Sequence, residues 1–228
     1  MISSGNFGLF DPRTSKGNDL PDAPGVYLVV LRPAANLLIK MKNVEVPQMT
    51  AFSFNGEYYK VIYVGESGKS LRSRDFVQHF KGTAGKSTLR KSLGCLLGYN
   101  LIPRDANALQ NGKTTFKDED ESALTEWMSN NLLLIYCATE DFTTQENKLI
   151  KEYNPPLNLK GNFNKVNSDF RKRLSYMRKY SAALSTPSRP DFNGRLSMDN
   201  VPIYSYCPVC GEVLWDNQPY CFICGWKA

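Results

Sequence analysis

Histidine is almost absent from this sequence of 228 residues, which contains only His79. A single imidazole excludes sites that need two or three of them, such as those of zinc hydrolases and of nucleases that pair histidines around a metal. It also disfavours a Ser–His–Asp catalytic site, which would depend on this one residue.

Long apolar runs are missing as well. The longest uncharged ones, Val26–Leu31 and Leu132–Ala138, are far shorter than the roughly 20 residues that cross a membrane. The first residues do not combine a basic start with an apolar stretch, so they do not have the pattern of a secretory signal. We therefore expect a soluble, cytoplasmic protein with no membrane partner.

The six cysteines are unevenly distributed. Four of them form two Cys-x-x-Cys-Gly motifs near the C-terminus: Cys207, Cys210, Cys221 and Cys224. This spacing suits four thiolates arranged tetrahedrally around one structural Zn²⁺ ion, and it predicts a zinc ribbon. An iron site and a redox dithiol are the alternatives. Cys95 and Cys137 lie in apolar patterns and are expected to be core residues.

Positive charge is concentrated in one segment. Residues 161–195 contain eight basic and two acidic side chains, a surplus that equals the net charge of +6 of the whole chain. Aromatic residues such as Phe163 alternate with the basic ones, a composition that suits binding to a polyanion. The candidate nucleic-acid-binding residues are Arg171, Lys172, Arg173, Arg178 and Lys179. The alternative is a helix face that is simply solvated.

Composition divides the chain into four parts. A polar lead-in at 1–22 precedes a main domain at 23–161, a basic connector and linker at 162–200, and the cysteine-rich unit at 201–228. The last part is too short to build a large apolar core, so a metal must supply much of its folding energy.

Periodicity predicts an α+β main domain. Strands are expected at Gly25–Leu31, Tyr58–Val64 and Leu132–Ala138. Helices are expected at Ser70–Phe80, Ser87–Leu97, Asp120–Asn131 and Thr143–Tyr153. Ser87 is expected to cap the second helix, and Thr143 or Thr144 the last one. Apolar segments at 36–41 and 51–54 predict an extra hairpin between the first two strands.

Two Gly-Lys-Ser tripeptides raise the question of a phosphate loop. That motif needs a further glycine five residues before the Gly-Lys pair, where it allows the loop to turn around the phosphates. Tyr63 and Phe80 occupy those positions for Gly68 and Gly85. ATP binding is therefore not expected.

An ordered set of motifs runs through the main domain. In chain order they are Gly25-Val-Tyr27, Tyr63-Val-Gly65, Leu71-Arg-Ser-Arg74, Glu146 and Asn158. Their order and spacing resemble the GIY-YIG nuclease family over about residues 24–161. The resemblance implies a small domain with a three-stranded antiparallel core sheet flanked by helices, here with an inserted hairpin. The zinc ribbon would follow it at the C-terminus.

The resemblance also implies roles for residues at the reaction centre. Tyr27 and Tyr63 would orient or deprotonate the attacking water, although an unperturbed tyrosine pKa of about 10 is high for a base at neutral pH. Arg74 would neutralise charge on the scissile phosphate, with Arg72 as the competing candidate. As an alternative, both tyrosines are simply half-buried strand residues.

Three further residues receive roles in the same way. Glu146 would hold one Mg²⁺ or Mn²⁺ ion, although a carboxylate in a first helical turn can also complement the helix dipole. Asn158 would fix its loop or contact the phosphate. His79 matches a position where some members place a supporting polar residue, and a packing role is the alternative.

Two departures from the family pattern stand out. Tyr27 and Tyr63 are 36 positions apart, so an insertion at about 33–57 must loop out for the two strands to pair. Valine replaces isoleucine in both short motifs, which preserves the β-branched shape. We therefore expect a divalent-metal-dependent endonuclease that hydrolyses DNA phosphodiester bonds, with the zinc ribbon assisting nucleic-acid or partner recognition. An RNA-processing nuclease and a non-catalytic nucleic-acid or protein adaptor, with its partner bound through the zinc ribbon, are the alternatives.

Overall fold

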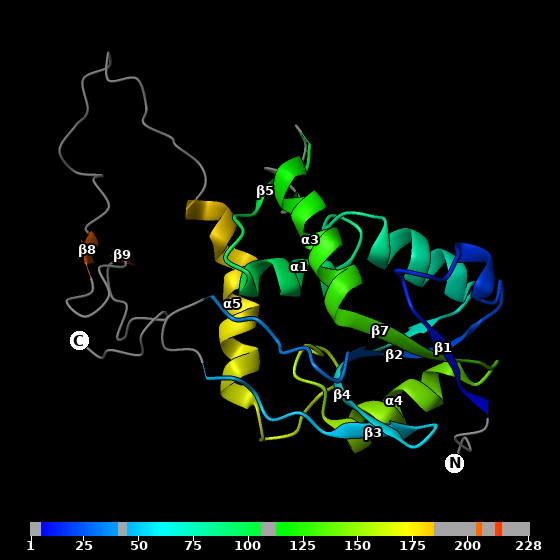
Figure 1. Cartoon of the computed structure of the whole chain (residues 1–228). Helices are drawn as coiled ribbons and strands as arrows, with labels where there is room; N and C mark the ends of the chain where they lie inside the picture. The colour runs from blue at the N-terminus through cyan, green and yellow to red at the C-terminus, as the bar shows by residue number, and fades with distance from the viewer. Residues whose placement is uncertain (1–5, 41–44, 106–112, 185–203, 207–212, 216–228) are drawn as a thin grey trace.

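An antiparallel sheet of five strands forms the centre of the computed structural model, which describes residues 6–40, 45–105, 113–184, 204–206 and 213–215 (Figure 1). The strand order is β1-β7-β2-β4-β3. The bounds are Gly8–Phe10 (β1), Gly25–Leu31 (β2), Ala51–Phe54 (β3), Glu57–Ser67 (β4) and Leu132–Ala138 (β7). The three strands expected from the sequence are β2, β4 and β7, and they occupy the middle of this wider sheet.

The central strand β2 is buried along its whole length. Its side chains alternate between two apolar clusters, as the period of two in a strand requires. Tyr27 and Val29 belong to one cluster, which also contains residues of helices α1, α3 and α5. Val26 and Leu28 belong to the other, which contains residues of helix α4. Coverage of both faces explains why β2 reads as an unbroken apolar run.

In the described part of the chain, five longer helices surround the sheet. They are η3 (Arg72–Phe80), α1 (Thr88–Leu96), α3 (Asp118–Asn131), α4 (Phe142–Tyr153) and α5 (Ser168–Leu184). Of these, η3 is a π-helix. A short 3-10 turn, η2 (Gly17–Asp19), lies in the N-terminal segment. Two small two-stranded sheets pair β5 (Ile102–Pro103) with β6 (Thr114–Thr115) and β8 (Tyr204–Tyr206) with β9 (Val213–Trp215). No helix in the described ranges has the length and apolar character of a membrane span.

The helix caps confirm one expectation and correct another. Ser87 is the N-cap of α1, where its Oγ accepts a hydrogen bond from the Arg90 N–H at 3.1 Å. Helix α4 has Asp141 as its N-cap, so the expected Thr143 or Thr144 cap is wrong. Because the helix begins at Phe142, both threonines already lie in its first turn.

The inserted hairpin differs from the expected one. Residues 51–54 form β3, but β3 pairs with the first half of β4, from Ala51 opposite Lys60 to Phe54 opposite Glu57. The turn is Asn55-Gly56, where both residues have positive φ, as a tight two-residue hairpin turn requires. Residues 36–40 form no strand, and 41–44 lie outside the described residues.

The N-terminal segment, expected to be a loose lead-in, contributes to the core. Strand β1 pairs with β7, and Phe10 and Leu20 are fully buried. Cys95 and Cys137 are buried, one in each of the two apolar clusters, which confirms the expectation that they are core cysteines.

A buried ion pair fixes the segment between η3 and α1. The Arg90 guanidinium donates to the Glu121 carboxylate on α3, with 2.7 Å between Nη2 and Oε2, and also to the carbonyl of His79. The other Glu121 oxygen accepts from the Ala84 N–H at 2.7 Å. Because the donors and acceptors satisfy one another, the end of η3 is held in place against α1 and α3.

Candidate active site

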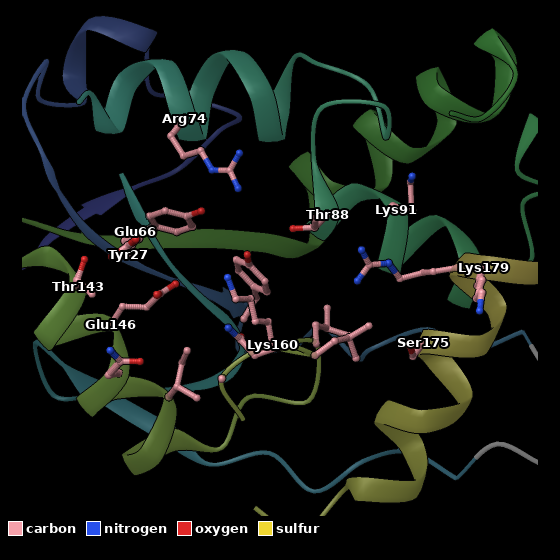
Figure 2. Close-up of a pocket in the computed structure, with 18 of the residues that line it drawn as sticks. Tyr27, Glu66, Arg74, Thr88, Lys91, Thr143, Glu146, Lys160, Ser175 and Lys179 are labelled. Carbon is pink, nitrogen blue, oxygen red and sulfur yellow. The ribbon is translucent and has the colours of Figure 1, made fainter. Parts of the chain in front are cut away.

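A cleft of about 1330 Å³ brings together residues from both ends of the main domain (Figure 2). Its lining comes from the strands β2, β4, β5 and β6, the helices η3, α1, α4 and α5, and the loop that follows α4. Five of the residues expected at the reaction centre line it: Tyr27, Tyr63, Arg74, Glu146 and Asn158. The fold therefore collects at one place side chains that are widely separated in the chain.

Gly65 makes room for the first tyrosine. Tyr27 on β2 lies opposite Gly65 on β4 in the strand register. A Cβ atom at Gly65 would lie 2.3 Å from the Tyr27 Oη, so any larger residue would collide with the ring. Tyr63, two residues earlier on β4, has its ring centroid 6.3 Å from that of Tyr27 and is partly exposed. The glycine of the second motif thus determines where the tyrosine of the first motif lies.

The Tyr27 hydroxyl begins a buried chain of hydrogen bonds. Its Oη lies 2.7 Å from the His79 Nε2, and the His79 Nδ1 lies 2.6 Å from the Ser87 Oγ. Burial lowers the pKa of His79 well below its usual range, and the nearby positive charge of Arg74 acts in the same direction. The ring is therefore neutral, with one nitrogen that donates and one that accepts. His79 lies behind Tyr27 and is not part of the cleft lining.

The environment of Tyr27 opposes its ionisation. Burial raises the pKa of the phenol well above 10, and the neighbouring Asp75 and Tyr63 add to the increase. Arg74, which extends from η3 into the cleft, partly offsets this effect (Figure 2). Its Nη1 also donates to the Gln78 Oε1 at 2.8 Å, which orients the guanidinium. A stable Tyr27 phenolate is thus disfavoured, and a proton can leave the hydroxyl only if an acceptor lies beside it.

Asp75 is a site residue that the sequence reasoning missed. It is fully buried, its Oδ1 lies 4.0 Å from the His79 Nε2, and neither of its oxygens has a hydrogen-bond partner among the described residues. Burial raises the pKa of this carboxyl well above its usual range, and the nearby positive charge of Arg74 partly opposes the shift. Its position four residues after Leu71 and four before His79 puts it on the apolar face of the helix, which is the signal that would have identified it.

A second carboxyl accompanies Glu146. Glu66, which follows Gly65 on β4, also lines the cleft (Figure 2). Burial raises the pKa of Glu146 to about 7, and the negative charge of Glu66 contributes, while Lys160 and Arg74 oppose the shift. The Glu66 Oε2 is buried and has no hydrogen-bond partner in the described part of the chain. Within the described part of the chain, no third histidine, cysteine or acidic residue joins Glu66 and Glu146 to form a metal-binding group of three.

Asn158 connects the loop after α4 to the sheet. Its Oδ1 accepts from the Val64 N–H and its Nδ2 donates to the Val64 carbonyl, both at 2.8 Å. The amide therefore binds β4 as a neighbouring strand would. Of the two roles considered for Asn158, this geometry corresponds to fixing the loop.

Basic side chains line the wall of the cleft that α1 and α5 form. They are Lys91, Arg178 and Lys179. The Lys91 Nζ donates to the Thr114 Oγ1 at 2.9 Å, and its pKa is lowered by burial and by the charge of Arg178. Neither Lys91 nor Arg178 takes part in an ion pair within the described residues. This wall therefore presents positive charge to whatever enters the cleft.

The five basic residues expected to bind nucleic acid do not lie on one continuous surface. Arg178 and Lys179 face the cleft, whereas Arg171 is buried and donates to the carbonyls of Asn164 and Val166. Lys172 is exposed and pairs with Asp169, and Arg173 lines a different hollow. Because neighbouring residues of a helix point in different directions, the charge of α5 is divided among several surroundings.

The four proposed zinc ligands, Cys207, Cys210, Cys221 and Cys224, lie outside the described residues. Of the C-terminal unit, only the short antiparallel pair β8 and β9 is described.

A family model of the GIY-YIG catalytic domain matches residues 25–180. The matched range includes every residue of the cleft discussed above. Comparison with curated proteins and with solved structures gave no match.

Proposed function

The chain belongs to the GIY-YIG catalytic-domain family, which implies a nuclease. From the side chains that line its cleft, we propose that the protein is a divalent-metal-dependent endonuclease that hydrolyses DNA phosphodiester bonds. The observation that supports the proposal most directly is that hydroxyl, guanidinium and carboxyl side chains line one cleft. A tyrosine hydrogen-bonded to a neutral histidine lies together with an arginine, and the carboxyl pair Glu66 and Glu146 lines the same space. Phosphodiester hydrolysis needs an oriented water, an acceptor for its proton and positive charge at the phosphate.

The residues of the cleft fit the divalent cation that the family implies. Two acidic side chains lie close enough for one to raise the pKa of the other, and the buried Glu66 Oε2 lacks a partner in the described part of the chain. Oxygen ligands with surplus negative charge suit Mg²⁺ or Mn²⁺. Glu146, together with Glu66, would hold this one ion, which when bound neutralises charge on the phosphate.

Tyr27 and His79 act together on the attacking water in this proposal. As the water gives a proton to the Tyr27 oxygen, the phenolic proton passes to the His79 Nε2, and the His79 Nδ1–H donates to Ser87. This relay is supported by the distances of 2.7 and 2.6 Å along the chain and by the neutral state of the imidazole. It avoids a free phenolate, whose formation burial opposes, and the proton stays on the imidazole only transiently, because burial also lowers the pKa of His79.

Arg74 and Tyr63 act on the phosphate side. The guanidinium of Arg74 can donate two parallel hydrogen bonds to phosphate oxygens and so stabilise the extra negative charge of the transition state. Tyr63 lies at the partly exposed side of the tyrosine pair, where its hydroxyl can orient the water or the phosphate. The water oxygen bonds to phosphorus as the bond to the 3′ oxygen breaks, so the ends are a 5′-phosphate and a 3′-hydroxyl, as the family resemblance implies.

The wall formed by Lys91, Arg178 and Lys179 would hold the phosphates that flank the scissile one. Its support is the position of these side chains in the catalytic cleft and the absence of ion pairs to Lys91 and Arg178 within the described residues. Binding through such contacts is sensitive to salt, because each contact releases counterions from the nucleic acid.

For the C-terminal unit we propose one structural Zn²⁺ ion held by the four cysteine thiolates, on the support of their spacing alone. The expected result of elemental analysis of the purified full chain is one zinc per chain, and the Cys207→Ser/Cys210→Ser double variant should lose it. A cysteine-rich unit that folds without zinc and retains iron or a disulfide would contradict this assignment.

The test of the nuclease uses supercoiled plasmid DNA and a structured RNA of similar length. The full chain is incubated with each in Mg²⁺, in Mn²⁺ and in EDTA. Glu146→Gln and Glu152→Gln are matched variants, because both change an acidic residue of α4 but Glu152 is exposed and outside the cleft. We expect metal-dependent nicking of DNA by the parent chain and by Glu152→Gln, and none by Glu146→Gln. Cleavage of the RNA alone would favour an RNA-processing enzyme, and binding without cleavage in either metal would favour an adaptor.

A further inference from the structure

An exposed aromatic ring lies in the loop between Asn158 and α5. Phe163 is 93% exposed, more than any other large hydrophobic side chain within residues 6–40, 45–105 and 113–179. Phenylalanine has no polar group that would favour contact with water, and its ring is normally buried. Its exposure here therefore needs an explanation.

The loop itself is firmly built. Asn162 is buried, its Nδ2 donates to the Pro155 carbonyl at 3.1 Å, and its Oδ1 accepts from the Asn164 N–H at 3.2 Å. The buried Arg171 guanidinium donates to the carbonyls of Asn164 and Val166. These bonds fix the backbone on both sides of the ring, so the ring is held in water by a specified loop conformation.

The ring lies beside the catalytic cleft. Phe163 lines a hollow of about 360 Å³, and this hollow shares Leu159 and Ser175 with the cleft lining. The exposed Lys165 and Lys172 line the same hollow, and Lys172 also pairs with the exposed carboxylate of Asp169. An aromatic ring with basic neighbours can bind a nucleotide, because the ring stacks on the base and the basic side chains contact the phosphates. The hollow also adjoins the cleft in which we propose that the phosphodiester binds.

We propose that the aromatic platform, defined as Phe163 with Lys165 and Lys172, stacks one nucleobase of the substrate strand while the lysines hold its phosphates. The proposal rests on the proposed nuclease function. Only a base without stacked neighbours on both faces can accept the ring, so the platform selects substrates with an unpaired nucleotide near the scissile phosphate. Every base has a π face, so this selection acts on structure and tolerates any sequence.

The binding test uses the full chain with Glu146→Gln, which prevents cleavage, and two fluorescent probes: a single-stranded oligonucleotide and the duplex of the same sequence. Phe163→Ala should weaken binding of the single strand about fivefold to a hundredfold, which is the range for loss of one base stack. Phe163→Trp should bind as tightly as the parent, whereas Phe163→Leu, apolar but without a π face, should bind as weakly as Phe163→Ala. Tyr58→Ala is the matched control, because Tyr58 is 72% exposed but lies outside the hollow and the cleft.

A direct readout is photocrosslinking with 5-iodouracil placed at successive positions of the single strand, followed by mass spectrometric mapping. We expect one position to give a crosslink on Phe163. Binding of the single strand that is equal in all Phe163 variants would overturn the stacking proposal and leave the nuclease intact. Full binding by Phe163→Leu would also overturn it, because the ring would then serve an ordinary apolar contact with a protein surface. Failure of the parent chain to bind either probe would overturn both the platform and the nucleic-acid-binding function.

Discussion

Glu146 should bind a divalent cation in competition with a proton near neutral pH. Its pKa is raised to about 7, chiefly by burial and further by the charge of Glu66. About one tenth of the chains therefore carry an ionised Glu146 at pH 6 and about nine tenths at pH 8. Because only the carboxylate binds a cation, the apparent affinity for Mn²⁺ should rise about tenfold per pH unit below pH 7 and level off near pH 8.

The contribution of Glu66 can be separated from that of burial. Glu66→Gln removes the like charge but keeps the shape of the side chain, so the pKa of Glu146 should move from about 7 toward its ordinary 4.5. The pH at which Mn²⁺ affinity levels off should fall by the same amount. At pH 8 the affinity itself should be lower than that of the parent, because one oxygen ligand is lost. Glu152→Gln should change neither quantity.

Mn²⁺ binding is measured by electron paramagnetic resonance of the free ion, on the full chain at half-unit intervals from pH 5.5 to 8.5. Proton release on binding, measured in buffers of different ionisation enthalpy, checks that the titrating group is the one that binds the ion. An affinity that is flat between pH 6 and 8 would refute the competition. A Glu66→Gln profile with the same midpoint as the parent would refute the coupling between the two carboxyls.

Three further substitutions test the geometry around the cleft. Gly65→Ala places a Cβ atom 2.3 Å from the Tyr27 Oη, so the free energy of unfolding in urea should fall by about 1–3 kcal/mol, and an unchanged value would contradict the close approach. Asn158→Leu leaves the N–H and carbonyl of Val64 without their side-chain partner, so the free energy of unfolding should fall by about 2–5 kcal/mol in the same assay. A decrease below about 0.5 kcal/mol would contradict the role of Asn158 in fixing its loop to β4. Arg178→Gln should reduce the slope of log K against log salt for DNA binding by about one, and an unchanged slope would remove Arg178 from the interface.

Elements defined by local patterns could be predicted from the sequence. Strands β2 and β7 have the expected bounds, because each is a run of apolar residues that the sheet buries. The inserted hairpin turns at Asn55-Gly56, a strong hairpin signal, whereas the apolar residues at 36–41 favoured a different pairing; residues 36–40 form no strand. Strand β1 has three residues, too few for a periodic pattern to be visible.

The candidate site could be predicted only where a family motif marks a residue. Tyr27, Arg74 and Glu146 were identified in this way. Glu66 was not, because its significance arises from its position beside Glu146, far along the chain, and Asp75 was not, although its helical spacing from Leu71 and His79 places it on the buried face. The basic residues of α5 could likewise be predicted only in part. The sequence shows that this segment is rich in positive charge, but the direction of each side chain depends on how the helix packs.

The central claim, that the Tyr27 hydroxyl takes part in the reaction, is tested most directly by one comparison. Single-turnover cleavage of plasmid DNA by the full chain in Mn²⁺ is measured for Tyr27→Phe and for the control Tyr58→Phe, with DNA affinity and melting temperature recorded alongside. We predict a loss of about 100-fold or more for Tyr27→Phe with DNA affinity preserved, the range for removal of an acid–base group, and no change for the control. Cleavage by a folded Tyr27→Phe variant at the parental rate would contradict the account.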